Sequence, residues 1–150
     1  MMQEQPEAAQ FVGMFIGIVF GLLIGIAINL VICFFLYRDF EGLPERFRLM
    51  PSWQVWLLII PLFNLVWNFF VFPKLSASYQ NYFAEQGDTS AGDCNRGLGL
   101  TFAILAVCSL IPCIGFIAGL AALVVVIIYL VKMNELKNKV ASAPVAQPEV

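Results

Sequence analysis

The chain has 150 residues, of which 61% are hydrophobic and 12% charged, and its mean hydropathy is +0.86. An average soluble domain is about one quarter charged, so this composition excludes an ordinary soluble domain and favours a single domain in a lipid bilayer. The net charge of −2 has mixed signs, which argues against a nucleic-acid partner. Histidine is absent and the four cysteines lack metal-binding spacing, so we expect no metal and no other cofactor.

The first apolar run covers residues 11–37 and contains no charged side chain. As an α-helix it would be about 40 Å long, against about 30 Å for the hydrocarbon core of a bilayer, so we expect a tilted or protruding transmembrane helix. Residues 1–10 carry no Lys or Arg, and no cleavage site follows the run. These features argue against a cleaved signal peptide.

The second predicted span covers residues 53–72 and follows a charged connector at 38–52. Pro61 is expected to kink this helix in its middle, and Pro73 to mark its exit. Residues 74–86 then predict a short amphipathic helix in the headgroup region. Its apolar face consists of Leu75, Tyr79, Tyr82 and Phe83. The alternative is that residues 74–86 continue the second helix into water.

Residues 98–131 contain no charge and would form a helix of about 50 Å, too long for one crossing. Turn chemistry at 112–115 divides them into predicted spans at 97–111 and 114–131, with a re-entrant pair that never crosses as the alternative. The last helix is expected to continue, charged, to residue 139. The sequence thus predicts an all-α, four-transmembrane-helix bundle as one domain, residues 1–139, and a disordered tail, residues 140–150.

The distribution of Lys and Arg sets the expected orientation. If all four spans cross, the termini and the second connector share one side and carry Lys74, Arg96, Lys132, Lys137 and Lys139. The first connector carries Arg38, Arg46 and Arg48 on the other side. The larger number favours both termini in the cytoplasm. The margin is thin, and insertion in both orientations is the alternative.

Glycine recurs at every fourth position of the first predicted helix, at Gly13, Gly17, Gly21 and Gly25. Four residues turn an α-helix by about 400°, so these glycines, here named the glycine stripe, form a nearly straight row that Asn29 continues. A groove without side chains lets another helix backbone approach closely. The partner could be the small residues of the last helix, Gly115 and Gly119, a second copy, or another protein.

Three asparagines lie within the predicted spans, at Asn29, Asn64 and Asn68. A side-chain amide in hydrocarbon needs a hydrogen-bonding partner, so these side chains are expected to point into the bundle. The favoured interpretation is interhelical hydrogen bonding, which for Asn64 and Asn68 includes the carbonyl that Pro61 would free. The alternative is a polar site for a substrate or ion.

Charged and catalytic side chains are missing from the predicted spans, which contain no Asp, Glu, Lys, Arg or His. A proton-coupled carrier needs a titrating group inside the membrane, as in the small four-helix multidrug exporters with their glutamate in the first helix. The predicted spans have no such group, so the sequence argues against a proton-coupled carrier. We expect Ser52 and Ser109 to have no base within reach, and no HExxH motif occurs, so we expect no catalytic residue and no enzyme.

Residues 61–67 (PLFNLVW) and 129–137 (YLVKMNELK) resemble segments of uncharacterised small bacterial four-helix inner-membrane proteins. The resemblance covers the chain from the second predicted span onward. It implies a location in the bacterial inner membrane and supplies no activity. From the residues themselves we expect a scaffold or accessory subunit that assembles through the first helix, as a homo-oligomer or in a larger membrane complex. The alternative is a small channel or transporter for neutral or weakly polar solutes.

Overall fold

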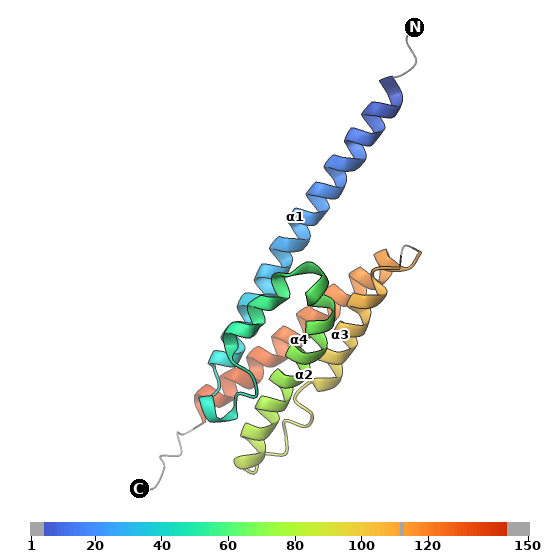
Figure 1. Cartoon of the computed structure of the whole chain (residues 1–150). Coiled ribbons are helices and arrows are strands. Elements are labelled where there is room, and N and C mark those ends of the chain that lie inside the picture. Colours follow the sequence, from blue (N-terminus) through green and yellow to red (C-terminus); the bar gives the residue numbers. More distant parts are fainter. Residues whose placement is uncertain (1–4, 112, 144–150) are drawn as a thin grey trace.

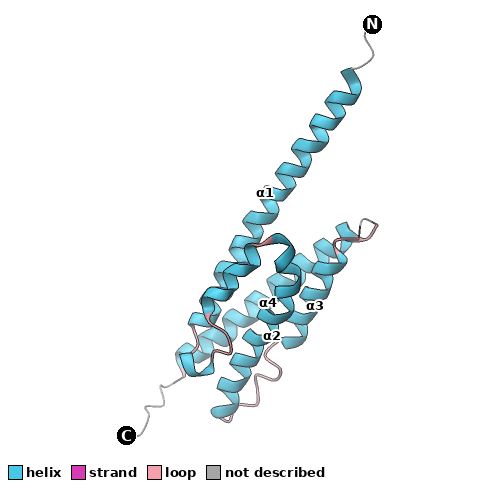
Figure 2. Cartoon of the chain, in the orientation of Figure 1, coloured by secondary structure: helices cyan, strands magenta, loops and turns pink. Residues whose placement is uncertain are grey.

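The computed structural model describes residues 5–111 and 113–143, and every regular element within them is helical (Figures 1 and 2). The α-helices are α1 (Gln5–Glu41), α2 (Pro61–Glu85), α3 (Arg96–Cys108) and α4 (Gly115–Ser142). Two 3-10 helices, η1 (Glu45–Phe47) and η2 (Ser52–Ile59), lie between α1 and α2. The predicted all-α class is therefore confirmed.

Two of these helices, α1 and α4, are long and apolar enough to cross a membrane. Only the last part of α1 packs on the other helices, and its first half projects away from them (Figure 1). α1 buries 6% of its most apolar stretch, against 28% for α4. The charged extension of α4 is helical, as predicted, and runs to Ser142, into the predicted tail. Residues 144–150 of that tail lie outside the described residues.

The predicted second span is not one helix. η2 ends at Ile59, Ile60 has extended backbone angles of φ −74° and ψ 112°, and α2 begins at Pro61. A residue before proline avoids helical angles, and proline at the first position of a helix lacks an N–H that would have no partner there anyway. The expected kink at Pro61 is therefore wrong, because this proline starts a helix. Pro73 lies inside α2 and does not end it.

Residues 74–86 are not a separate interfacial helix, because α2 continues without a break to Glu85. The predicted apolar face is correct, but Leu75, Tyr79, Tyr82 and Phe83 are buried within the helical bundle and do not face headgroups or water. α2 ends where Gly87 adopts a φ of +72°, with hydrogen bonds from Gly87 N to Ala84 O and from Asp88 N to Phe83 O. This bonding pattern satisfies the last carbonyls of the helix.

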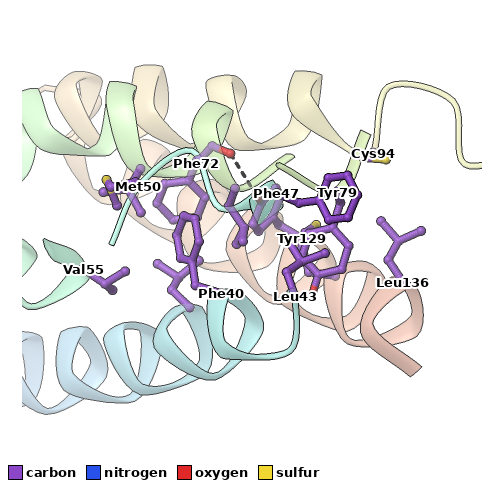
Figure 3. Close-up of a cluster of buried hydrophobic side chains, with 14 of the residues drawn as sticks. Phe40, Leu43, Phe47, Met50, Val55, Phe72, Tyr79, Cys94, Tyr129 and Leu136 are labelled. Carbon is purple, nitrogen blue, oxygen red and sulfur yellow. Dashed lines mark hydrogen bonds between the residues drawn. The ribbon is translucent and has the colours of Figure 1, made fainter. Parts of the chain in front are cut away.

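The core joins α2, α3 and α4 to the end of α1 and to the connector that follows it (Figure 3). Phe72 lies at its centre, with its ring 4.8 Å from the Phe102 ring and 5.0 Å from the Tyr129 ring. Gly99 of α3 allows this approach, since a Cβ there would lie 2.8 Å from Phe72 Cβ. Substituting Phe72 or Gly99 therefore probes the same contact between α2 and α3.

We expect Gly99→Val to destabilise the protein by about 1–3 kcal/mol more than Gly97→Val, through overpacking against Phe72. Gly97 lies in the same turn of α3, but a Cβ there meets only Asp93 Oδ2 at 3.6 Å. The two variants have the same cost in helix propensity, so their difference reports the contact. Thermal unfolding in detergent measures it, and equal stabilities would contradict the close packing of α3 on α2.

The connector after α1, the end of α2 and the end of α4 all lie at the same end of the bundle. Arg46 forms an ion pair with Glu85 at 2.9 Å, Lys137 Nζ lies 3.4 Å from Asp39 Oδ1, and the Leu49 N–H donates to Ser78 Oγ at 3.0 Å. Four alternating spans would separate these partners by the hydrocarbon core, about 30 Å. The predicted alternation of sides is therefore wrong, and with it the basis for placing both termini together. The first residues of α1 and the last residues of α4 lie far apart, towards opposite ends of the molecule (Figure 1).

Candidate functional site

The glycine stripe contacts no other element of the described chain. A Cβ added at Gly13, Gly17, Gly21 or Gly25 would have nothing within 4 Å outside its own helix and neighbours. The flanking side chains are also exposed, including Phe20 at 65% and Ile24 at 45%. The stripe is thus a ridge of backbone that starts on the projecting half of α1, at Gly13 and Gly17, and leads at Gly21 and Gly25 to a cavity beside η2 and α2.

The two predicted packing glycines of α4 face α3 and not the stripe. A Cβ at Gly115 would clash with the Ser109 carbonyl, and one at Gly119 would lie 4.0 Å from Ser109 Cβ. Ala118 and Ala122, on the same side of α4, are buried. The small residues of α4 therefore close the hairpin with α3, and they are not the partner of α1.

A cavity of about 320 Å³ brings the end of the glycine stripe together with two of the predicted asparagines. It lies between α1 and the turn from η2 to α2. Its lining consists of Gly21, Leu22, Gly25, Ile26, Asn29, Ile59, Pro61 and Asn64. The break at Ile60 creates this arrangement, because it lets α2 begin beside α1 with Asn64 in its first turn.

The asparagines use their oxygens in short-range hydrogen bonds. Cys33 Sγ donates to Asn29 Oδ1 at 3.3 Å, and Asn68 Nδ2 donates to Asn64 Oδ1 at 2.7 Å. The N–H₂ groups of Asn29 and Asn64 have no acceptor among the described residues. Asn68 is buried and does not line the cavity. The cavity therefore offers two amide donors to an acceptor from outside the chain.

The expected role of the asparagines beside a freed carbonyl is wrong. Pro61 leaves Leu57 O without a helical partner, but Ile60 N donates to that oxygen at 3.2 Å. Asn64 and Asn68 bond to each other within α2, so their contact is local and does not join two helices. Beside the cavity, a hydrogen bond between helices comes instead from Trp67, whose Nε1 donates to Gln54 O of η2 at 3.0 Å.

Sequence reasoning missed a buried polar cluster at the other end of the bundle. Asp39 is 1% exposed, pairs with Lys137, and accepts a hydrogen bond on its main-chain oxygen from the Tyr79 hydroxyl at 2.8 Å. The Tyr129 hydroxyl donates to Phe72 O at 3.1 Å and lies 3.0 Å from Ser76 Oγ. Asp39 and Lys137 are 98 positions apart, and both flank apolar runs where charges are normally solvated, so no local pattern could have paired them.

The chemistry open to the cavity is binding or helix contact, since none of its lining side chains is acidic or basic. Among the described residues, no cluster of three His, Cys, Asp or Glu side chains could hold a metal ion. The chain matches no family model, no curated protein and no solved structure in the comparisons made, so its function is argued from these contacts alone.

Proposed function

We propose that this chain is an integral membrane interaction protein whose copies assemble through the glycine stripe of α1. The observation that carries the proposal is the backbone ridge of the stripe, where a Cβ added at any of the four glycines would have nothing within 4 Å outside its own helix and neighbours. The resemblance of residues 61–67 and 129–137 to segments of small bacterial inner-membrane proteins supports a location in that membrane. The helical bundle, at the opposite end of α1, would then be the part of each copy that stays outside the contact between copies.

Lipid tails cannot fill this ridge as well as another helix can. In a membrane, helices associate through dispersion contacts and interhelical hydrogen bonds, and both strengthen when small residues let backbones approach. Gly13, Gly17, Gly21 and Gly25 provide three overlapping pairs at the required spacing. Such repetition along one straight row favours an extended helix–helix contact.

A second copy of the chain fits this surface because the stripe is complementary to itself. Copies inserted in the same direction run parallel, so a two-fold contact brings each glycine close to its counterpart. The row leads to Asn29, whose N–H₂ group lacks an acceptor among the residues that the structure describes. The partner's Asn29 would supply one, and an amide in hydrocarbon gains from such a bond.

The test is the double variant Gly17→Leu and Gly21→Leu, analysed by size in mild detergent. Two branched side chains would stand where the backbones meet, and overpacking costs about 1–3 kcal/mol per site. The assembly constant should fall at least tenfold, since about 1.4 kcal/mol is a factor of ten. The variant should migrate as a smaller species and keep its helical content.

The control is Phe15→Leu with Val19→Leu on the opposite face of α1, where both side chains are exposed. This control should assemble like the parent chain. If the glycine variant also keeps the size of the parent, the stripe does not join copies. A smaller size for the control alone would move the contact to the opposite face.

A small transporter for neutral or weakly polar solutes is the second candidate, and the cavity between Asn29 and Asn64 favours it. A solute path would have to continue from this cavity along α1. Towards the N-terminus, however, residues 11–28 carry no polar side chain, and Gly13 and Gly17 face open space. We therefore favour assembly over transport.

A further inference from the structure

The bundle contains two helical hairpins that begin and end on the same side. η2 leads from the connector to Ile60, and α2 returns until Glu85 pairs with Arg46 of that connector. α3 leads to the turn at 109–114, and α4 returns until Lys137 pairs with Asp39 at the end of α1. Figure 1 shows both turns lying part-way along the length of α1.

The outward arms of the two hairpins are too short to cross a bilayer. η2 has 8 residues and is about 16 Å long at the rise of a 3-10 helix. α3 has 13 residues and is about 20 Å long. Both fall short of a hydrocarbon core of about 30 Å, whereas α1 with 37 residues is about 55 Å long.

The turns themselves are suited to hydrocarbon. In the second turn, Ser109 N donates to Leu105 O, Ile111 N to Cys108 O, and Ile114 N to Ile111 O. In the first turn, Ile60 N donates to Leu57 O and Asn64 N to Ile60 O. Backbone at membrane depth must find its hydrogen bonds within the protein, and these five N–H groups do so.

The side chains at both turns are large, apolar and exposed. Leu62 is 82% exposed at the first turn, and Phe116 and Ile117 are 81% and 72% exposed at the second. Turns in water are normally polar, and large apolar patches on a surface mark contact with lipid or protein. Lipid hydrocarbon is the partner that covers both turns and the exposed side chains of α1 at once.

All the positive charge lies at the other end of this arrangement. The eight basic residues are Arg38, Arg46, Arg48, Lys74, Arg96, Lys132, Lys137 and Lys139. The first 37 residues contain none. Because the connector, the second half of α2, the start of α3 and the end of α4 lie together, these charges share one side of the membrane. A bias of eight to none towards one side places that side in the cytoplasm.

We infer that α1 alone crosses the bilayer, that the η2–α2 and α3–α4 hairpins enter it from the cytoplasmic side and turn back inside it, and that the N-terminus lies outside. The hairpins are thus a surface for the lipid of one leaflet. This inference rests on the proposed membrane location and is independent of assembly through the glycine stripe.

The first test crosslinks Arg46→Cys to Glu85→Cys in native membranes, with the four natural cysteines replaced by alanine. Both positions are solvent-exposed in the structure, so the changes should leave the fold intact. A short bifunctional maleimide should link them within one chain. Gln10→Cys paired with Arg46→Cys should give no link. Absence of the Arg46–Glu85 link in a protein with parental melting behaviour would overturn the inference.

The second test uses Cys113, which is exposed at the α3–α4 turn, as the single remaining cysteine. A membrane-impermeant maleimide should fail to label it from either side and should label it after detergent is added. Labelling from the side of the N-terminus would show that the hairpin crosses. Release of the whole protein by alkaline washing would instead refute the membrane location, and neither outcome depends on the size measured for the glycine variant.

Discussion

Lys137→Met should lower the free energy of unfolding by about 3–5 kcal/mol, because it leaves a buried carboxylate without its counter-charge. The Asp39 side chain is 2% exposed, and its Oδ2 has no hydrogen-bond partner in the described structure. Lys137 is the only cation within ion-pair distance of it among the described residues. Methionine keeps the aliphatic stem that packs over Gly42, so the variant removes chiefly the charge.

Two control variants separate the ion pair from other effects. Lys139→Met changes an exposed lysine two positions away and should stay within about 0.5 kcal/mol of the parent chain. Asp39→Asn combined with Lys137→Met removes both charges and should recover most of the loss, since a neutral pair needs no counter-charge. Thermal unfolding in detergent measures all three. If Lys137→Met behaves like Lys139→Met, then α4 does not end beside α1.

The helices themselves were largely predictable, because apolar runs and proline positions define them locally. The first predicted helix corresponds to α1, which is longer at both ends, and the last to α4, which begins one residue later and ends at Ser142. Pro61 was misassigned because hydropathy is the same whether proline kinks a helix or starts one. The deciding feature is the extended backbone at Ile60, which hydropathy does not report.

The path of the chain was not predictable from the apolar runs, because a span count assumes that each run crosses. Contacts between residues far apart in the sequence decide otherwise, above all Asp39 with Lys137 and Arg46 with Glu85. The sequence also identified the glycine stripe and Asn64 separately. Only the η2–α2 hairpin, which returns the chain beside α1, brings Gly21, Gly25 and Asn64 around one cavity.

Phe72→Ala should destabilise the bundle by about 3–5 kcal/mol, the range for removing a fully buried aromatic side chain. Phe72 is 0% exposed and contacts Gly99 of α3, Phe102 of α3 and Tyr129 of α4. Gly99 has no side chain that could move into the space left behind. The cavity should therefore persist, which places the cost towards the upper part of this range.

Phe70→Ala is the matched control, since Phe70 lies two positions away and is 47% exposed. Phe70→Ala should lower the free energy of unfolding far less than Phe72→Ala, because the Phe70 side chain is already partly exposed outside the bundle. Size analysis of Phe72→Ala adds a second readout, since the stripe lies away from Phe72, begins on the projecting part of α1, and should still join copies when the bundle is weakened. A Phe72→Ala variant as stable as Phe70→Ala would show that the Phe72 side chain does not pack against Phe102 of α3 and Tyr129 of α4. Loss of assembly at temperatures where the variant remains folded would place the contact between copies on the bundle and not on α1.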